Sequence, residues 1–137
     1  MGRAPVVAVF NTSSDIVDLL RFTFEHAGFV VISAMTSQVR EGTISLDHFV
    51  MQHDPDVVVY DIAPPYEENW RLLEHMWNTP ALRDRPIVLT TTNAVHVRNL
   101  AGDRQLFEII GKPYDLDQIV SAARKALPPE MRPGLPH

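Results

Sequence analysis

Five short apolar segments recur along the chain and alternate with longer segments of helical pattern. Most of their residues are β-branched or aromatic, and several segments are apolar at every position, which is typical of strands covered on both faces. We expect strands at residues 6–10, 29–33, 56–60, 86–90 and 106–110. Strands that alternate with helices form a parallel sheet between two helical layers, so the pattern predicts an α/β fold with helices on both faces of the sheet.

The segment between the first two strands has the clearest helical pattern. Its apolar residues recur with the spacing of one buried helical face: Ile16, Leu19, Leu20, Thr23, Phe24 and Ala27. Ser13 or Ser14 can cap the start of this helix, and Asp115 can cap the start of the last helix. A further helix is expected to carry its large apolar residues on one face: Trp70, Leu73 and Trp77.

Other segments have weaker patterns. Residues 43–52 and 93–103 are weaker helix predictions, and residues 34–42 are expected to form a polar connection. After residue 127 the chain is rich in proline and has no apolar face. We therefore expect one domain over residues 1–127, followed by a proline-rich flexible tail over residues 128–137.

The composition is that of a soluble globular protein. The 137 residues are 45% hydrophobic and 21% charged, and the formal net charge of −5 comes without a basic stripe, which argues against binding to nucleic acid. Because the chain has no cysteine, it has no disulfide and no thiolate metal site. No apolar run approaches the roughly 18 residues of a membrane span, and the start of the chain lacks the pattern of a signal peptide. We expect a cytoplasmic protein without a membrane partner.

Candidate functional residues follow the predicted strands. In open parallel sheets, ligands bind just beyond the carboxyl ends of the strands. Asp61 follows the third strand, Thr91 the fourth and Lys112 the fifth, so these side chains are expected to converge at one edge of the sheet. Each residue alone has an ordinary explanation, as a helix cap, a strand residue or a solvated turn. Their joint placement predicts a site.

Over residues 5–127 the chain resembles the receiver domain of bacterial two-component response regulators. The resemblance rests on three motifs, "PDVVVYDIAPP", "RPIVLTT" and "GKPYDLDQIV". It implies a doubly wound, flavodoxin-like sheet of five strands in the order 2-1-3-4-5. It also implies that a histidine kinase phosphorylates Asp61, that Thr91 binds the phosphoryl oxygen and that Lys112 pairs with the phosphate. A cis peptide bond before Pro113 is implied as well.

The chain departs from this family at two places. The family has two adjacent acidic residues after the first strand, which hold Mg²⁺, and the corresponding residues here are Asn11 and Thr12. The aromatic switch residue, three positions before the lysine, is replaced by Ile109. Phe107 has the same strand parity as Ile109 but lies closer to the start of the strand. The usual coupling between the threonine and the aromatic residue is therefore left open.

The charges at the predicted site favour neither a metal ion nor rapid phosphorylation. One carboxylate, Asp61, and one ammonium, Lys112, neutralise each other. Mg²⁺ would find only that carboxylate, a backbone carbonyl near Ala63 and neutral oxygens of Asn11 or Thr12. We therefore predict no metal site beyond weak Mg²⁺ binding, and no other cofactor. Without a metal ion, Lys112 alone faces the charge of about −1.5 to −2 that a phosphoryl group adds.

An alternative interpretation assigns the loop of residues 11–14 to a phosphate or a flavin. Flavodoxins bind phosphate with a hydroxyl-rich loop at the start of a helix. The loop here has no glycine that would let the backbone approach the ligand closely. The histidines are scattered and no hydrolase triad is recognisable, so we predict neither a zinc site nor an enzyme.

The resemblance and the departures together imply a receiver-like signalling protein of a phosphorelay with impaired Mg²⁺-dependent phosphorylation. We expect it to be a stand-alone receiver without an output module. Such a protein acts by binding other proteins. The expected partners are a histidine kinase, a phosphotransferase or a signalling target, and a second copy of the chain in a homodimer.

Overall fold

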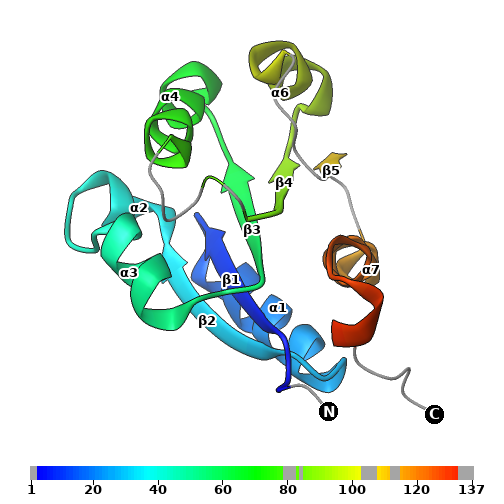
Figure 1. Cartoon of the computed structure of the whole chain (residues 1–137). Helices are drawn as coiled ribbons and strands as arrows, with labels where there is room; N and C mark the ends of the chain where they lie inside the picture. Colours follow the sequence, from blue (N-terminus) through cyan, green and yellow to red (C-terminus); the bar gives the residue numbers. More distant parts are fainter. Residues whose placement is uncertain (1–2, 79–82, 84, 103–107, 112–114, 133–137) are drawn as a thin grey trace.

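A five-stranded parallel sheet forms the centre of the molecule (Figure 1). The computed structural model describes residues 3–78, 83, 85–102, 108–111 and 115–132. Its strands lie in the order β2-β1-β3-β4-β5 and pair in parallel throughout. Their bounds are β1 Val6–Asn11, β2 Val30–Met35, β3 Val57–Ile62, β4 Ile87–Thr91 and β5 Glu108–Gly111. The predicted fold class and strand order are confirmed.

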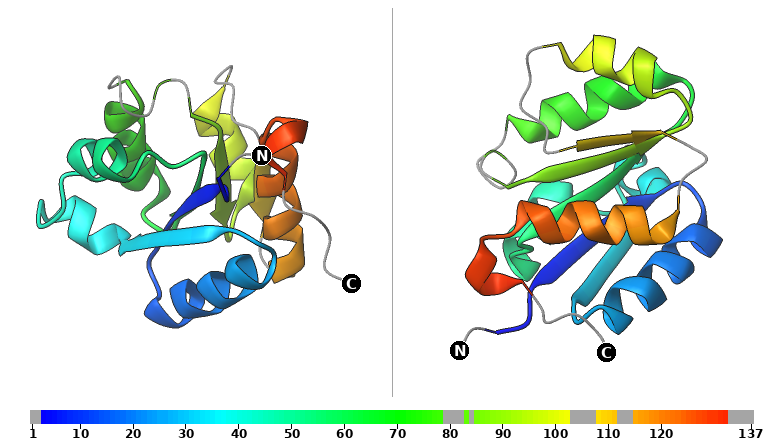
Figure 2. Two further views of the ribbon diagram at one scale, coloured as in Figure 1. Left: turned by 60° about the horizontal axis from the view of Figure 1, so that its bottom comes forward. Right: turned by 90° about the vertical axis from the view of Figure 1, so that its right-hand side faces the viewer.

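Helices cover both faces of the sheet. In the right-hand view of Figure 2, α4 and α6 lie on one side of the sheet, and α1 and α7 lie on the other. The α-helices are α1 Ser14–His26, α2 Thr36–Arg40, α3 Leu46–His53, α4 Tyr66–Trp77, α6 Ala94–Ala101 and α7 Leu116–Ala126, and a 3-10 turn, η1, spans Pro129–Met131. Ser13 caps α1 by accepting a hydrogen bond from the Ile16 amide, and Asp115 caps α7, as predicted.

The apolar segments are continuous because each strand contributes to two cores. Alternate residues of β1, β3 and β4 face α1 and α7, where they pack with Leu20, Phe24 and Ile119. The residues between them face the other helical layer and pack with Trp70 and Leu73. Since adjacent strand residues point to opposite faces, strands buried on both sides need apolar residues at every position.

The predicted polar connection over residues 34–42 is wrong. In the structure β2 continues to Met35 and is followed directly by α2. Thr36 and Val39 of this short helix are buried at 4% and 5% exposure. Short helices are stabilised by tertiary packing rather than by their own propensity. Because polar residues separate the two buried positions, the sequence shows no helical pattern here.

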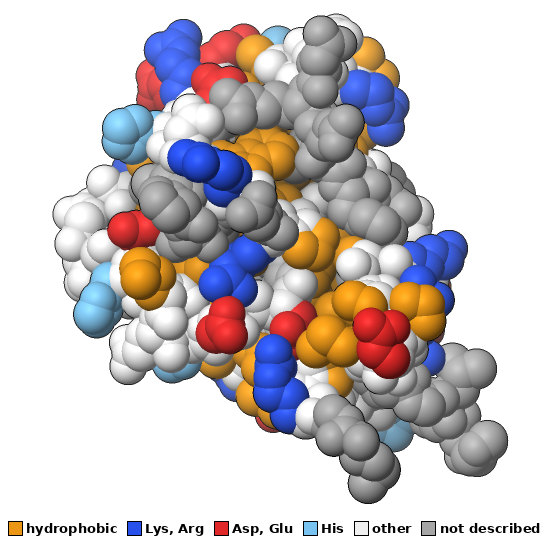
Figure 3. All heavy atoms as spheres, in the orientation of Figure 1, with side chains coloured by type: hydrophobic (Ala, Val, Ile, Leu, Met, Phe, Trp, Pro, Cys, Tyr) orange, Lys and Arg blue, Asp and Glu red, His pale blue; other side chains and the backbone are white. Residues whose placement is uncertain are grey.

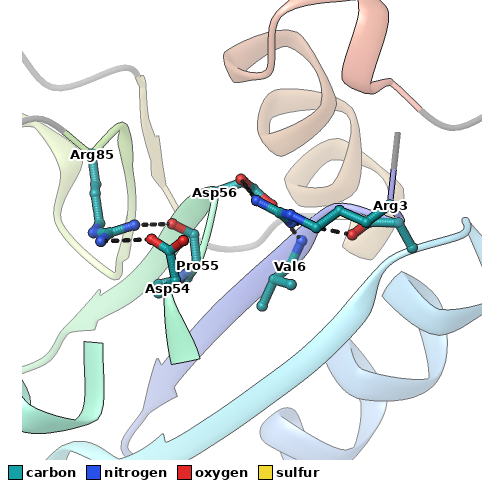
Figure 4. Close-up of polar contacts among 7 residues, drawn as sticks. Arg3, Val6, Asp54, Pro55, Asp56 and Arg85 are labelled. Carbon is teal, nitrogen blue, oxygen red and sulfur yellow. Dashed lines mark hydrogen bonds and ion pairs between the residues drawn. The ribbon is translucent and has the colours of Figure 1, made fainter. Parts of the chain in front are cut away.

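A set of ion pairs and hydrogen bonds ties together the chain segments at the amino-terminal edge of the sheet (Figure 4). The Asp56 carboxylate accepts two hydrogen bonds from the Arg3 guanidinium, at 2.7 and 2.8 Å, and one from the Val6 amide at 2.8 Å. Nearby, Arg85 pairs with Asp54 at 2.9 Å. Partial burial alone would raise the pKa of Asp56, but the hydrogen bonds from Arg3 and Val6 outweigh it and hold the pKa below its ordinary value.

The chain continues in ordered structure beyond α7. Leu127 is buried at 2% exposure, and η1 follows it. The Arg132 guanidinium donates hydrogen bonds to the carbonyls of Arg124, Lys125 and Leu127. Residues 133–137 lie outside the described part of the chain, so the boundary predicted at residue 127 and the flexible tail remain predictions.

Charged side chains of both signs are interspersed on the face that Figure 3 shows, where the described Lys and Arg side chains do not join into a stripe. Within the ranges that the structure describes, no helix is long and apolar enough to cross a bilayer.

Candidate functional site

Asp61 lies at the carboxyl edge of the sheet, one residue before the end of β3. By strand alternation its side chain shares a face with Val57 and Val59, which face α1 and α7. The residue is buried at 2% exposure. Its carboxylate accepts a hydrogen bond of 2.6 Å from the Thr90 hydroxyl at Oδ1, and one of 3.5 Å from the Thr12 hydroxyl at Oδ2. The Thr12 and Thr90 hydroxyls therefore lie on either side of the Asp61 carboxylate.

Asn11 serves the turn that joins β1 to α1. Its side chain is buried at 1% exposure, and its Oδ1 accepts a hydrogen bond of 3.0 Å from the Ser13 amide. The Ser13 hydroxyl in turn accepts from the Ile16 amide at 3.4 Å. These local bonds engage the amides that a phosphate in this loop would need, which weakens the flavodoxin-like alternative.

Thr90, rather than Thr91, contacts Asp61. The two strands are in register with Asp61 opposite Thr90, so the side chains of these two residues lie on the same face. Thr91 is fully buried, and its hydroxyl accepts a hydrogen bond of 3.3 Å from the Asn93 amide. Sequence reasoning missed Thr90, although two successive threonines at a strand end indicate that one of them faces each side. The phosphate-binding role of Thr91 stays a prediction.

Four positions near the fifth strand have different outcomes. Lys112, Pro113 and Phe107 lie outside the described residues, so their roles remain untested. Ile109 is half-buried on β5, pairs with Leu89 and packs against the core that faces α4 and α6. The position that an aromatic switch residue takes in the family is therefore occupied by an aliphatic side chain that packs against this core.

The loop after β3 is held by Asn69, a residue that the sequence did not indicate. Asn69 is buried at 7% exposure. Its amide donates a hydrogen bond of 2.7 Å to the Ala63 carbonyl, and its Oδ1 accepts one of 2.9 Å from Arg40. The carbonyl two residues after Asp61 therefore already has a strong donor.

The donor set around Asp61 does not fit Mg²⁺. This ion requires several oxygen ligands in near-octahedral geometry, and carboxylate charge is its main attraction. Oδ1 of Asp61 is engaged by Thr90, the Ala63 carbonyl is engaged by Asn69, and the side chains of Asn11 and Thr12 are neutral. In the part of the chain that the structure covers, no group of three His, Cys, Asp or Glu side chains could hold a metal ion.

Comparison with known proteins identifies the fold. No family model and no curated protein match the chain. A signal receiver domain of two-component signal transduction (histidine kinase) from Clostridium thermocellum is 18% identical, with 90% of this chain and 97% of that chain covered at a TM-score of 0.71. The chemotaxis protein CheY4 of Vibrio cholerae is 17% identical, with 91% and 100% covered at a TM-score of 0.73.

A response regulator from Thermotoga maritima is 20% identical, with 90% of this chain and 98% of that chain covered at a TM-score of 0.69. At these identities the likeness establishes the fold alone. The chain has the receiver fold of response regulators.

Proposed function

We propose that this chain is a response-regulator-like signalling protein in which Asp61 holds the phosphoacceptor position and Mg²⁺-dependent phosphorylation is impaired. One observation supports the proposal above the others. The buried Asp61 carboxylate accepts hydrogen bonds from two hydroxyl groups, at 2.6 Å from Thr90 and 3.5 Å from Thr12, and Thr12 stands at one of the two positions where the resemblance places the acidic pair that holds the metal ion. Receiver domains are generally signalling modules rather than enzymes, and we assign no catalytic residue.

Charge explains the impairment. Transfer of a phosphoryl group to Asp61 would bring about −1.5 to −2 charge to a buried position, by analogy with other phosphorylated side chains. A metal ion normally neutralises the transferring group. With Asn11 and Thr12 in place of two carboxylates, Mg²⁺ loses most of its attraction to the site. We infer that signalling proceeds through binding to a histidine kinase, a phosphotransferase, a signalling target or a second copy of the chain.

The proposal is tested by restoring the missing acids. The full chain is incubated with acetyl phosphate and Mg²⁺, and the phosphorylated fraction is followed by intact-mass spectrometry. We expect little gain in the wild type and at least about tenfold faster labelling in Asn11→Asp/Thr12→Asp, because the metal ion is then held. The labelling should disappear with a chelator and when Asp61→Asn is added.

A matched control adds two carboxylates elsewhere. Gln52 of α3 and Ser121 of α7 are exposed and lie outside the loops at the carboxyl edge of the sheet, so Gln52→Glu/Ser121→Asp changes the net charge equally without building a metal site. This variant should label as slowly as the wild type. Rapid, Mg²⁺-dependent labelling of wild-type Asp61 contradicts the proposal.

A further inference from the structure

Three successive threonines, residues 90–92, lie at the end of β4. The first contacts Asp61, and the third contacts Tyr66, which is the first residue of α4. Thr90 donates to the Asp61 carboxylate at 2.6 Å. Thr92, two residues later, shares a hydrogen bond of 2.5 Å with the Tyr66 hydroxyl. The end of β4 is therefore hydrogen-bonded to a buried carboxylate through Thr90, and the residue that follows the strand, Thr92, is hydrogen-bonded to the start of α4.

Tyr66 belongs to a cluster that connects α4 with α6. Its ring packs edge-on against the His96 ring, with 5.5 Å between centroids. His96 Nε2 lies 2.9 Å from a carboxylate oxygen of Glu67. We call these four residues, Tyr66, Glu67, Thr92 and His96, the clasp. Asn93 caps α6 immediately beside it, accepting a hydrogen bond of 3.1 Å from the His96 amide.

On the side of β4 away from β3, the neighbouring strand is β5. Its residue at the predicted switch position makes no hydroxyl contact like that of Tyr66. Ile109 of β5 is aliphatic and packs into the core. A Cβ atom on Gly111 would lie 3.2 Å from Ala94 Cβ, so the end of β5 packs closely against the start of α6. The hydroxyl contact to the segment after β4 comes from α4 instead.

We propose that Tyr66 is the switch residue of this chain, and that the clasp passes the state of Asp61 to α6. The inference rests on the proposed role of Asp61 as the position that receives the signal. The Thr90 bond is buried and has a charged acceptor, whereas the clasp is exposed, so the Thr90 bond is the stronger of the two. When a phosphoryl group bonds to Oδ1 of Asp61, Thr90 loses this acceptor. The end of β4 then shifts, and the Thr92–Tyr66 bond and the first turn of α6 loosen with it.

Amide hydrogen exchange of the full chain tests the link. The reporter is the first turn of α6, where the Val97 amide bonds to the Asn93 carbonyl at 3.1 Å. Tyr66→Phe removes only the hydroxyl and keeps the ring beside His96, and Thr90→Val removes the donor to Asp61 at nearly constant volume. Each variant should raise the exchange rate roughly threefold to tenfold, the range expected for one lost hydrogen bond.

Coupling is shown by the double variant. If the two bonds act in series, Tyr66→Phe/Thr90→Val exchanges no faster than the faster of the single variants. Thr90→Ser retains the hydroxyl and should restore the wild-type rate. Tyr60→Phe is the matched control, because it removes the hydroxyl of another tyrosine, a buried residue of β3 that lies outside the clasp.

Two results would overturn the inference. One is an exchange rate in Tyr66→Phe equal to that of Tyr60→Phe, which makes the clasp irrelevant to α6. The other is multiplication of the two single effects, which makes the clasp and the Asp61 contact independent. Because neither readout depends on phosphorylation, failure here is distinguishable from failure of the labelling experiment.

Discussion

The Asp56 carboxylate at the amino-terminal edge of the sheet should contribute more to stability than its ion pair suggests. Arg3 is 54% exposed, and an ion pair with such an exposed partner contributes little to stability. The bond from the Val6 amide is different, since it satisfies a backbone donor with a charged acceptor and contributes about 1.5–3 kcal/mol. We therefore expect Asp56→Ala to lower the free energy of unfolding by about 2–3 kcal/mol, and Arg3→Ala to lower it by much less.

Urea unfolding at neutral pH measures both values, provided that the m-value does not change. The exposed carboxylate Asp18 supplies the control, and Asp18→Asn should have little effect. Equal losses in Arg3→Ala and Asp56→Ala would refute the reasoning, because the ion pair would then carry the whole effect.

The same carboxylate predicts a dependence on pH. Its pKa is lowered in the folded protein from a model-compound value of 3.8. A group with a depressed folded pKa contributes stability above its unfolded pKa and loses it as the pH falls through the folded value. The difference in stability between wild type and Asp56→Asn should therefore be constant near neutral pH and shrink below about pH 4. A difference that grows on acidification would reverse the assigned sign.

Three further changes have distinct expected outcomes. Phe24 is fully buried and packs edge-on against Phe29 at 5.0 Å, so Phe24→Ala should cost about 3–5 kcal/mol in denaturant unfolding, and a loss below 1 kcal/mol would mean that the core collapses around the gap. Asn69→Ala leaves the Ala63 carbonyl without its donor and should cost about 1–3 kcal/mol by the same assay, and a wild-type stability would show that this bond is not needed. Arg132→Ala should speed proteolysis after α7 while changing global stability by less than about 1 kcal/mol, since its bonds are largely exposed.

Much of the fold was predictable because burial on both faces makes strands conspicuous. The continuous apolar segments located β1, β3 and β4 to within two residues at either end. Helix α2 was missed because its five residues include only two buried positions, Thr36 and Val39. Such a short helix forms because residues at the end of β2 lie beside the core, where tertiary packing stabilises it. This packing cannot be inferred from the local sequence.

The site was predictable in its location but not in its contacts. Strand exits place Thr12 and Asp61 together, because the carboxyl ends of parallel strands share one edge of the sheet. The choice of Thr90 over Thr91 depends on the register between β3 and β4, which brings Asp61 opposite Thr90. Asn69 reaches the Ala63 carbonyl through the packing of α4, a relation that no spacing in the sequence expresses.

The polar groups around Asp61 are satisfied by the chain itself. Thr90 and Thr12 supply donors to the carboxylate, and Asn69 supplies one to the Ala63 carbonyl. In a receiver site that depends on a metal ion, such oxygens must be available, because they coordinate the ion. Under our proposal, a phosphoryl group that bonds to Oδ1 of Asp61 must first displace the Thr90 hydroxyl, since both require that oxygen. The chemical event and the release of β4 are then one step, and its cost opposes phosphorylation even when a phosphodonor is abundant.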